Sequence, residues 1–292
     1  MFRVRVKNER LWAQLREAPV LNRLVRLDMQ AISLMKDPET IDRAFSDIDL
    51  LSGVSKQTNK DRFASVDGLS LQHIENRSLS RIHDVGVSSG ITSLELRRQL
   101  AAVGFSGDMF ISDKFARFYI NRRWLSTDVY DAERKLVCAY CGPFVGDSED
   151  TWKFPVSKYL YRRAAGRSFD DSARQDFLLL HPDVLEAIEE GLLHFIDYDA
   201  FRDEQENAFD FVRCMNLLNR GYFPTESLEN GLRALYRSLT VGGILQIGRT
   251  HLDGDNHVSF YEKAAGGFQP VDSVGDGSEI DQLVVDFSDT SS

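Results

Sequence analysis

A glycine-containing turn separates a strand-like segment from a helix-like segment early in the chain. The segment Arg81–Val85 has strand character and contains Asp84, and the turn after it places Gly86 and Gly90 around a Val-Ser-Ser spacer. Glycines at such a junction let a ligand approach the backbone closely. The helix that begins near Ile91 points its free N–H groups and the positive end of its dipole at that ligand. The pattern predicts a small-molecule site, although a plain strand–turn–helix joint has the same form.

Acidic side chains end two further strand-like segments. Asp113 ends "GDMFISD", while Asp197 and Asp199 both stand at the end of "LLHFIDYD". Ligands of parallel sheets bind beyond the carboxyl ends of the strands, so we expect these acids to lie at the same edge as the glycine turn. Asp113 could instead cap a helix beside Lys114. The register of the strand leaves open which acid of the "IDYD" pair faces a ligand.

The elements that must position these residues alternate between strand and helix from about residue 80 onward. The expected strands include "RIHDV", "GDMFISD", "LLHFIDYD", "FDFVRCM" and "GGILQIG", the helices "ITSLELRRQLAAV" and "TESLENGLRALYRSL", and the closing hairpin "HVSFYE" with "IDQLVVDF". The second helix begins at a threonine, Thr225, that suits an N-cap. Such alternation predicts an α/β fold with a mostly parallel sheet wound on both faces.

Two regions lie outside this alternation. Between Asp113 and Leu192 stand about 78 residues, more than a crossover connection needs. Because a structureless loop of this length is uncommon, residues 116–178 are predicted to form an inserted small β-containing lobe over the active site. Residues 1–77 have helical periodicity and are expected to form an N-terminal helical cap, which leaves residues 78–292 as the main domain.

Composition narrows the function classes. The formal net charge of −10 argues against a nucleic-acid partner, and no apolar run approaches the roughly 18 residues of a membrane span. The basic N-terminus lacks the apolar stretch of a secretory signal, and three cysteines provide no disulfide framework, so a reducing cytoplasm is expected. Cys138 and Cys141 form a C-x-x-C pair, which supplies only two of the four ligands of a structural zinc site. We interpret them as ordinary lobe cysteines and expect no metal.

Five motifs in order give the chain a family resemblance. "DVGVSSG" resembles the first motif, D-x-G-x-G-x-G, of the class I S-adenosylmethionine-dependent methyltransferases, with Ser88 at the central glycine. "FISD", "HFIDYDAF" and "FDFVRCMNLLNRGYF" resemble the second to fourth strands of that family. "LYRSLTVGGILQIGR" resembles the fifth-strand motif, with Val241 in place of the usual proline. The resemblance covers roughly residues 78–292, and the segment "CMNLLNRGYF" is also similar to the chemoreceptor-glutamate methyltransferases.

The resemblance implies a Rossmann-like, doubly wound, seven-stranded sheet with an antiparallel last strand. It also implies S-adenosylmethionine as cofactor and S-adenosylhomocysteine as product. In that family arrangement Asp113 accepts hydrogen bonds from the ribose hydroxyls and Asp199 from the adenine amino group. Asp84 orders the loop or meets the cofactor's amino group. The complete set of predicted cofactor-binding residues is Asp84, Gly86, Ser88, Gly90, Asp113, Lys114, Phe115, Asp199, Ala200, Cys214 and Asn216, with Phe115 open to a core role instead.

Residues near the transferred methyl group should come from the turns after the fourth and fifth strands. Asn216, Arg220 and Tyr222 follow the fourth strand, and Arg249 and His251 follow the fifth. Methyl transfer is an in-line displacement, so alignment supplies much of the catalysis and a base is needed only for a nucleophile that holds its proton. His251, Asn216 and Arg220 are the predicted catalytic residues. His251 is the candidate base, and its alternative is a solvated surface histidine.

Two classes of function follow. The first is methyl transfer to a small or medium metabolite, at oxygen or nitrogen, by a cytoplasmic enzyme with no nucleic-acid or membrane partner. The second is a cofactor-binding protein of the same fold without catalysis, acting as a partner or regulator; Ser88 and Val241 support it. A nicotinamide oxidoreductase fits less well because the Gly-Gly turn does not suit it. The methyl acceptor and the oligomeric state stay open.

Overall fold

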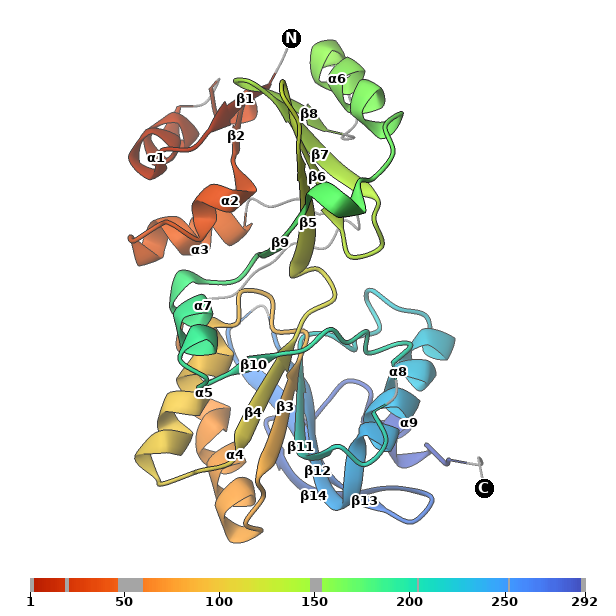
Figure 1. The fold of residues 1–292 in the computed structure, drawn as a ribbon. Coiled ribbons are helices and arrows are strands. Elements are labelled where there is room, and N and C mark those ends of the chain that lie inside the picture. The colour runs from red at the N-terminus through yellow and green to blue at the C-terminus, as the bar shows by residue number, and fades with distance from the viewer. Residues whose placement is uncertain are drawn as a thin grey trace. The chain divides into compact units, whose positions relative to one another are not determined.

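The chain forms two compact units in the computed structural model, which describes residues 3–18, 21–46, 60–147, 154–203, 205–251 and 253–289 (Figure 1). Unit 1 comprises residues 1–58 and 115–185, and unit 2 comprises residues 59–114 and 186–292. The expected insertion, residues 116–178, therefore falls within one unit. The remainder of that unit comes from the N-terminal part of the chain.

Unit 2 is built on a seven-stranded sheet. Its strands lie in the order β10-β4-β3-β11-β12-β13-β14. The first five are parallel to one another, and β13 pairs antiparallel with both β12 and β14. Their bounds are Arg81–Val85 (β3), Asp108–Ser112 (β4), His194–Phe195 (β10), Phe209–Met215 (β11), Leu239–Thr250 (β12), Asn256–Ala264 (β13) and Gly267–Val274 (β14).

Helices cover both faces of this sheet. Figure 1 shows α4 and α5 on one face and α8 and α9 on the other. Their bounds are Ala64–Asn76 (α4), Ile91–Ala102 (α5), Thr225–Ser238 (α8) and Asp281–Val285 (α9), while α7, Pro182–Glu189, spans the boundary between the units. Leu228, Leu232 and Leu235 of α8 are buried at helical spacing, so an apolar stripe fixes that helix against the sheet. The predicted α/β, doubly wound, mostly parallel fold is confirmed.

The end of the sheet departs from the sequence expectation. The hairpin is formed by β13 and β14, whereas the segment "IDQLVVDF", expected as a strand, contains α9. Asp281 opens that helix, and its carboxylate accepts hydrogen bonds from Ser259 (2.9 Å) and Tyr261 (2.6 Å) of β13. The β propensity of the Val-Val pair is overridden by these long-range contacts. The N-cap of α8 is Pro224, one residue before the expected threonine.

Unit 1 holds a second seven-stranded sheet, in the order β2-β1-β8-β7-β6-β5-β9. Only the β1–β2 pair is parallel. The strands are Arg3–Val6 (β1), Val25–Leu27 (β2), Arg117–Arg122 (β5), Thr127–Asp131 (β6), Leu136–Cys141 (β7), Phe144–Asp147 (β8) and Arg174–Leu178 (β9). The helices are Glu9–Glu17 (α1), Met29–Ile32 (α2), Pro38–Ser46 (α3) and Pro155–Ala165 (α6), with short 3-10 turns at Leu21–Arg23 and Asp171–Ala173.

The N-terminal region differs from the helical cap expected over residues 1–77. β1 pairs with β8 of the insertion, so two N-terminal strands complete the lobe's sheet, and α4 belongs to unit 2. The short segments "RVRV" and "VRL" have too few residues for a period of two to stand out against the neighbouring helical repeats. Residues 47–59 of this region lie outside the described residues. No helix among the described residues is long and apolar enough to cross a bilayer.

Candidate functional site

The glycine turn predicted to bind a ligand lies at the carboxyl end of β3 and leads into α5. Gly86, Ser88 and Gly90 have positive φ angles of 75°, 57° and 80°. The N–H groups of Gly86 and Val87 both donate to the carbonyl of Ser112 at the end of β4. Gly90 is the N-cap of α5 and provides no side-chain cap, so the first N–H groups of that helix point into the turn without one. The backbone is therefore shaped as a cradle at a helix N-terminus.

The position of Ser88 explains how a serine replaces the central glycine of the motif. A φ of 57° lies in the left-handed region, which costs a non-glycine residue about 1 kcal/mol. The backbone N–H of Ser88 donates to Oδ2 of Asp113 at 2.8 Å, and this bond holds the strained residue in place. Asp113 directly follows β4. The acid at the end of this strand and the glycine turn after β3 therefore meet at one edge of the sheet, as the sequence predicted.

Asp84 is buried and paired with an arginine that the motif analysis did not include. Its Oδ2 accepts from Nη2 of Arg213 at 2.5 Å and from Oγ of Ser93 at 2.6 Å. Arg213 lies on β11, is 0% exposed, and donates its Nη1 to Asp67 of α4 at 3.0 Å. The Asp67–Arg213–Asp84 triad links α4, β11 and the end of β3. The Asp84 carboxylate is therefore tied to α5 and β11, and its two predicted roles stay predictions.

The sequence contained a signal for this triad. An arginine inside the apolar strand "FDFVRCM" is rarely buried unless it is paired. The partner Asp67 is 146 residues away along the chain, on a helix whose docking could not be read from the sequence.

Folding stability should depend on pH through Asp67. Burial, partly offset by Arg213 and reinforced by the charge of Asp84, raises the pKa of Asp67 to about 6. Because this value lies above that of an unfolded aspartate, folding favours the protonated acid. The free energy of unfolding should therefore fall as pH rises from about 4 to about 6, by on the order of 2–3 kcal/mol, and change no further above that range.

Urea titrations between pH 4 and 7 test this dependence. Asp67→Asn should flatten the slope, while Glu229→Gln, which changes an exposed acid on α8, should leave it unchanged. A slope that is identical in wild type and Asp67→Asn would assign the pH dependence to other groups.

Asp199 is the half-buried acid of the "IDYD" pair. Its Oδ2 accepts from Nζ of Lys114 at 2.8 Å and its Oδ1 from the backbone N–H of Phe201 at 3.1 Å, whereas Asp197 is exposed. Lys114, predicted to touch the cofactor, thus forms an ion pair with a second predicted cofactor residue. The two acids Asp113 and Asp199 follow the neighbouring parallel strands β4 and β10.

Three predicted cofactor residues lie in hydrophobic cores. Cys214 is 0% exposed in the core of unit 2, and burial raises the pKa of its thiol to about 12. Ala200 is buried in the same core. Phe115 packs against the core of unit 1, which is the alternative role that its sequence left open. The assignment of Cys214 and Ala200 to the cofactor stays a prediction, and both residues are buried in the core of unit 2.

The predicted catalytic residues follow β11 and β12. Asn216 has a φ of 59°, and its Oδ1 accepts from the backbone N–H of Thr250 at 2.8 Å, which ties the two turns together. Arg220 is exposed, and its backbone N–H donates to Glu279 at 2.8 Å. The same carboxylate binds Arg249 at 2.7 Å. His251 is exposed, with its ring centroid 4.2 Å from that of His257.

The cysteines have no metal partners among the residues that the structure describes. No group of three or more histidine, cysteine or acidic side chains there could hold a metal ion. Cys138 is buried in unit 1 and Cys141 is partly buried, and both are free thiols.

Comparison with known proteins does not establish what this chain does. No protein-family model matches the chain, and no curated protein matches it. Among solved structures, the S-adenosylmethionine-dependent methyltransferase SibL in its apo form is 14% identical over 64% of this chain and 36% of its own, with a TM-score of 0.33. The [4+2]-cyclase SpnF is 17% identical over 63% of this chain and 44% of its own, with a TM-score of 0.31.

A third structure matches over more of its length. The PH0226 protein from Pyrococcus horikoshii OT3 is 11% identical over 84% of this chain and 85% of its own, with a TM-score of 0.36. By contrast, the match covers less than half the length of SibL and of SpnF. At such low identity and TM-score, these likenesses say nothing about the reaction that this chain performs.

Proposed function

We propose that unit 2 binds S-adenosylmethionine at the carboxyl edge of its parallel strands and transfers the methyl group to a small or medium metabolite, at oxygen or nitrogen. The hydrogen bond between the Ser88 N–H and Asp113 carries this proposal. It joins the glycine turn to the acid that follows β4, at the N-terminus of α5. The five motifs noted in the sequence lie on five neighbouring strands of one sheet, in the spatial order β10-β4-β3-β11-β12.

The donor and acceptor groups present fit such a cofactor. A carboxylate has two oxygens and about four acceptor sites, so Asp113 can hold Ser88 and still accept from ribose hydroxyls. Asp199 has the same capacity beside Lys114. The uncapped start of α5 offers N–H groups to the cofactor's carboxylate. When bound, S-adenosylmethionine supplies an electrophilic methyl group on a sulfonium; the chain's own residues bind, align and exclude water.

The binding test is the substitution Asp113→Ala. Loss of a charged acceptor should weaken S-adenosylhomocysteine binding by about 1.5–3 kcal/mol, and release of the Ser88 N–H should loosen the loop as well. Isothermal titration calorimetry measures the change. Asp108→Ala is the matched control, since Asp108 stands on the same strand at its opposite, exposed end.

Unchanged affinity in Asp113→Ala, with the fold intact by circular dichroism, would remove Asp113 from the site. Binding of NAD but not of S-adenosylhomocysteine to the wild-type protein would contradict the proposal as a whole.

Turnover is a separate question from binding. Incubation with methyl-labelled S-adenosylmethionine and a fractionated metabolite extract should yield a labelled small molecule. Tight binding of the cofactor without any labelled product would instead favour the second candidate, a cofactor-binding partner or regulator of this fold.

A further inference from the structure

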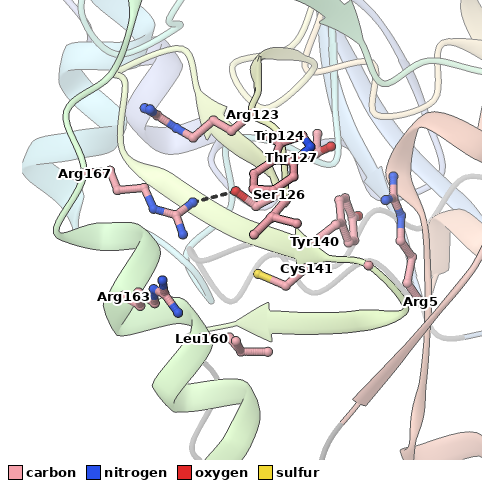
Figure 2. Close-up of a pocket in the computed structure, with 12 residues that line it drawn as sticks. Arg5, Arg123, Trp124, Ser126, Thr127, Tyr140, Cys141, Leu160, Arg163 and Arg167 are labelled. Atoms are coloured by element: carbon pink, nitrogen blue, oxygen red, sulfur yellow. Dashed lines mark hydrogen bonds between the residues drawn. The ribbon is translucent and has the colours of Figure 1, made fainter.

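A pocket of about 580 Å³ in unit 1 is lined by four arginines (Figure 2). Its walls come from β1, the β5–β6 turn, the end of β7, and α6 with the residues after it. Arg5, Arg123, Arg163 and Arg167 surround it. The chain as a whole carries a net charge of −10, so four cations around one hollow are a local departure from its composition.

One buried carboxylate holds two of these arginines. Asp128 of β6 is 0% exposed and accepts from Nε of Arg123 at 3.0 Å and from Nη1 of Arg167 at 2.9 Å. Arg167 also donates to Oγ of Ser126 at 2.6 Å, the contact drawn in Figure 2. A single negative charge therefore faces two positive charges, and the pair retains one unit of positive charge. Pairing with Asp128 fixes both guanidinium groups in position without neutralising them.

The third arginine is neutralised. Arg5 donates through Nε (2.8 Å) and Nη2 (2.5 Å) to Asp28, whose side chain is 4% exposed, and its guanidinium lies 4.1 Å from the centre of the Tyr140 ring. This arrangement accounts for Arg5 as a structural residue that forms one wall of the pocket.

The fourth arginine is not explained by structure. Arg163 is exposed near the end of α6, and it forms no ion pair with any of the residues that the structure describes. Four arginine charges and the two carboxylate charges of Asp28 and Asp128 sum to a net charge of +2 around the pocket. Cys141 on the floor does not oppose an anion, since burial raises the pKa of its thiol and keeps it neutral at pH 7.

The mouth of the pocket has an apolar side. Trp124 and Leu125, adjacent in the β5–β6 turn, are 95% and 71% exposed, and Leu160 of α6 lines the pocket as well. The turn is closed by the Arg123 N–H donating to the Ser126 carbonyl at 2.8 Å, so the tryptophan is carried on a hairpin and not on a loose segment. An indole held beside fixed guanidinium groups offers a surface for a planar apolar group.

We propose that this pocket binds a small molecule that carries a phosphate monoester and an aromatic or apolar body. A phosphate monoester has a charge of about −1.5 to −2 at pH 7, which matches the charge of +2 around the pocket. Arginine binds phosphate through parallel N–H donors, and Arg163 and Arg167 provide donors beyond those used within the protein. The apolar body packs on Trp124 and Leu160. The inference concerns unit 1 alone and does not rest on methyl transfer in unit 2.

Titration calorimetry with phenyl phosphate on the full chain tests the proposal. The wild-type protein should bind phenyl phosphate more tightly than inorganic phosphate, and phenol should not bind at the same millimolar concentrations. Arg163→Gln should weaken phenyl phosphate binding by about tenfold or more. The matched control is Arg162→Gln, the exposed neighbour on α6 that does not line the pocket, which should bind as the wild type does.

A second variant separates the two halves of the ligand. Trp124→Ala should reduce the preference for phenyl phosphate over inorganic phosphate, while leaving the affinity for inorganic phosphate unchanged. Both variants change exposed side chains, so both should fold. The proposal is overturned if phenyl phosphate does not bind, if phenol binds equally well, or if Arg163→Gln and Arg162→Gln have the same affinity.

Discussion

Replacing Arg213 with methionine is expected to lower the free energy of unfolding of unit 2 by about 3–5 kcal/mol. The variant leaves Asp67 and Asp84 buried together without the cation that lies between them, and their side chains are only 3% and 6% exposed. An uncompensated buried charge costs more than the pair ever contributed, because its desolvation is no longer offset. The cost should be smaller near pH 5 than at pH 7, since a protonated Asp67 does not need a cation.

Hydrogen exchange of the β3, β11 and β12 amides is the suitable measurement, because the two units need not unfold together. The matched control is Arg237→Met, which removes a partly exposed ion pair to Asp289 at 3.8 Å and should cost less than about 1 kcal/mol. Equal protection in Arg213→Met and wild type would mean that the triad is not needed to hold α4 and the glycine turn on the sheet.

Periodicity was sufficient to predict the centre of unit 2. β3, β4, β11 and β12 and the helix α5 appear where the pattern of strand-like and helix-like segments placed them. Parallel strands buried on both faces are rich in apolar residues, and β11 has no exposed residue along its length. The placement of the acids followed from the parallel direction of the strands, because parallel strands bring their carboxyl ends to one edge of the sheet.

Long-range pairing could not be predicted in the same way. Val4 pairs with Val25 on one side and with Phe144 on the other, which joins an N-terminal strand to a segment about 140 residues later. Nothing local in a four-residue strand specifies such a partner, so residues 1–77 read as helical from their neighbours. The same limit applies to α9, whose local β propensity gave way to the contacts of Asp281.

In the candidate site, too, some residues could be predicted from the local sequence and others depend on distant partners. The glycine turn and Asp113 were predicted from backbone requirements, which leave a mark on the sequence. Arg213 was not, because its function depends on two partners from distant elements. Cys214 and Ala200 were assigned to the cofactor by motif position, and both are buried in the core of unit 2. Successive side chains of β11 point to opposite faces, so motif position alone does not decide which side chain of that strand faces a ligand.

Backbone hydrogen bonds hold Thr250 and His251 in place near the proposed acceptor position. The backbone N–H of Thr250 donates to Asn216 Oδ1, and the N–H of His251 donates to the Asp255 carbonyl at 2.8 Å. The first bond holds the end of β12 against the turn after β11, and the second closes the turn between β12 and β13. His251 is thus an exposed imidazole on a defined backbone, and its ring is open to an incoming acceptor.

If His251 is that base, His251→Ala should lower turnover by roughly 10²–10⁴, with little change in the affinity for S-adenosylhomocysteine. His251→Gln should be nearly as slow, because glutamine keeps a hydrogen bond but accepts no proton. The control is His194→Gln, whose side chain faces Asp108 at the start of β4, at the other edge of the sheet. A wild-type turnover rate in His251→Gln would show that His251 is not the general base. Catalysis would then rest on alignment, and Asn216→Ala, which frees the Thr250 N–H, becomes the substitution expected to slow it.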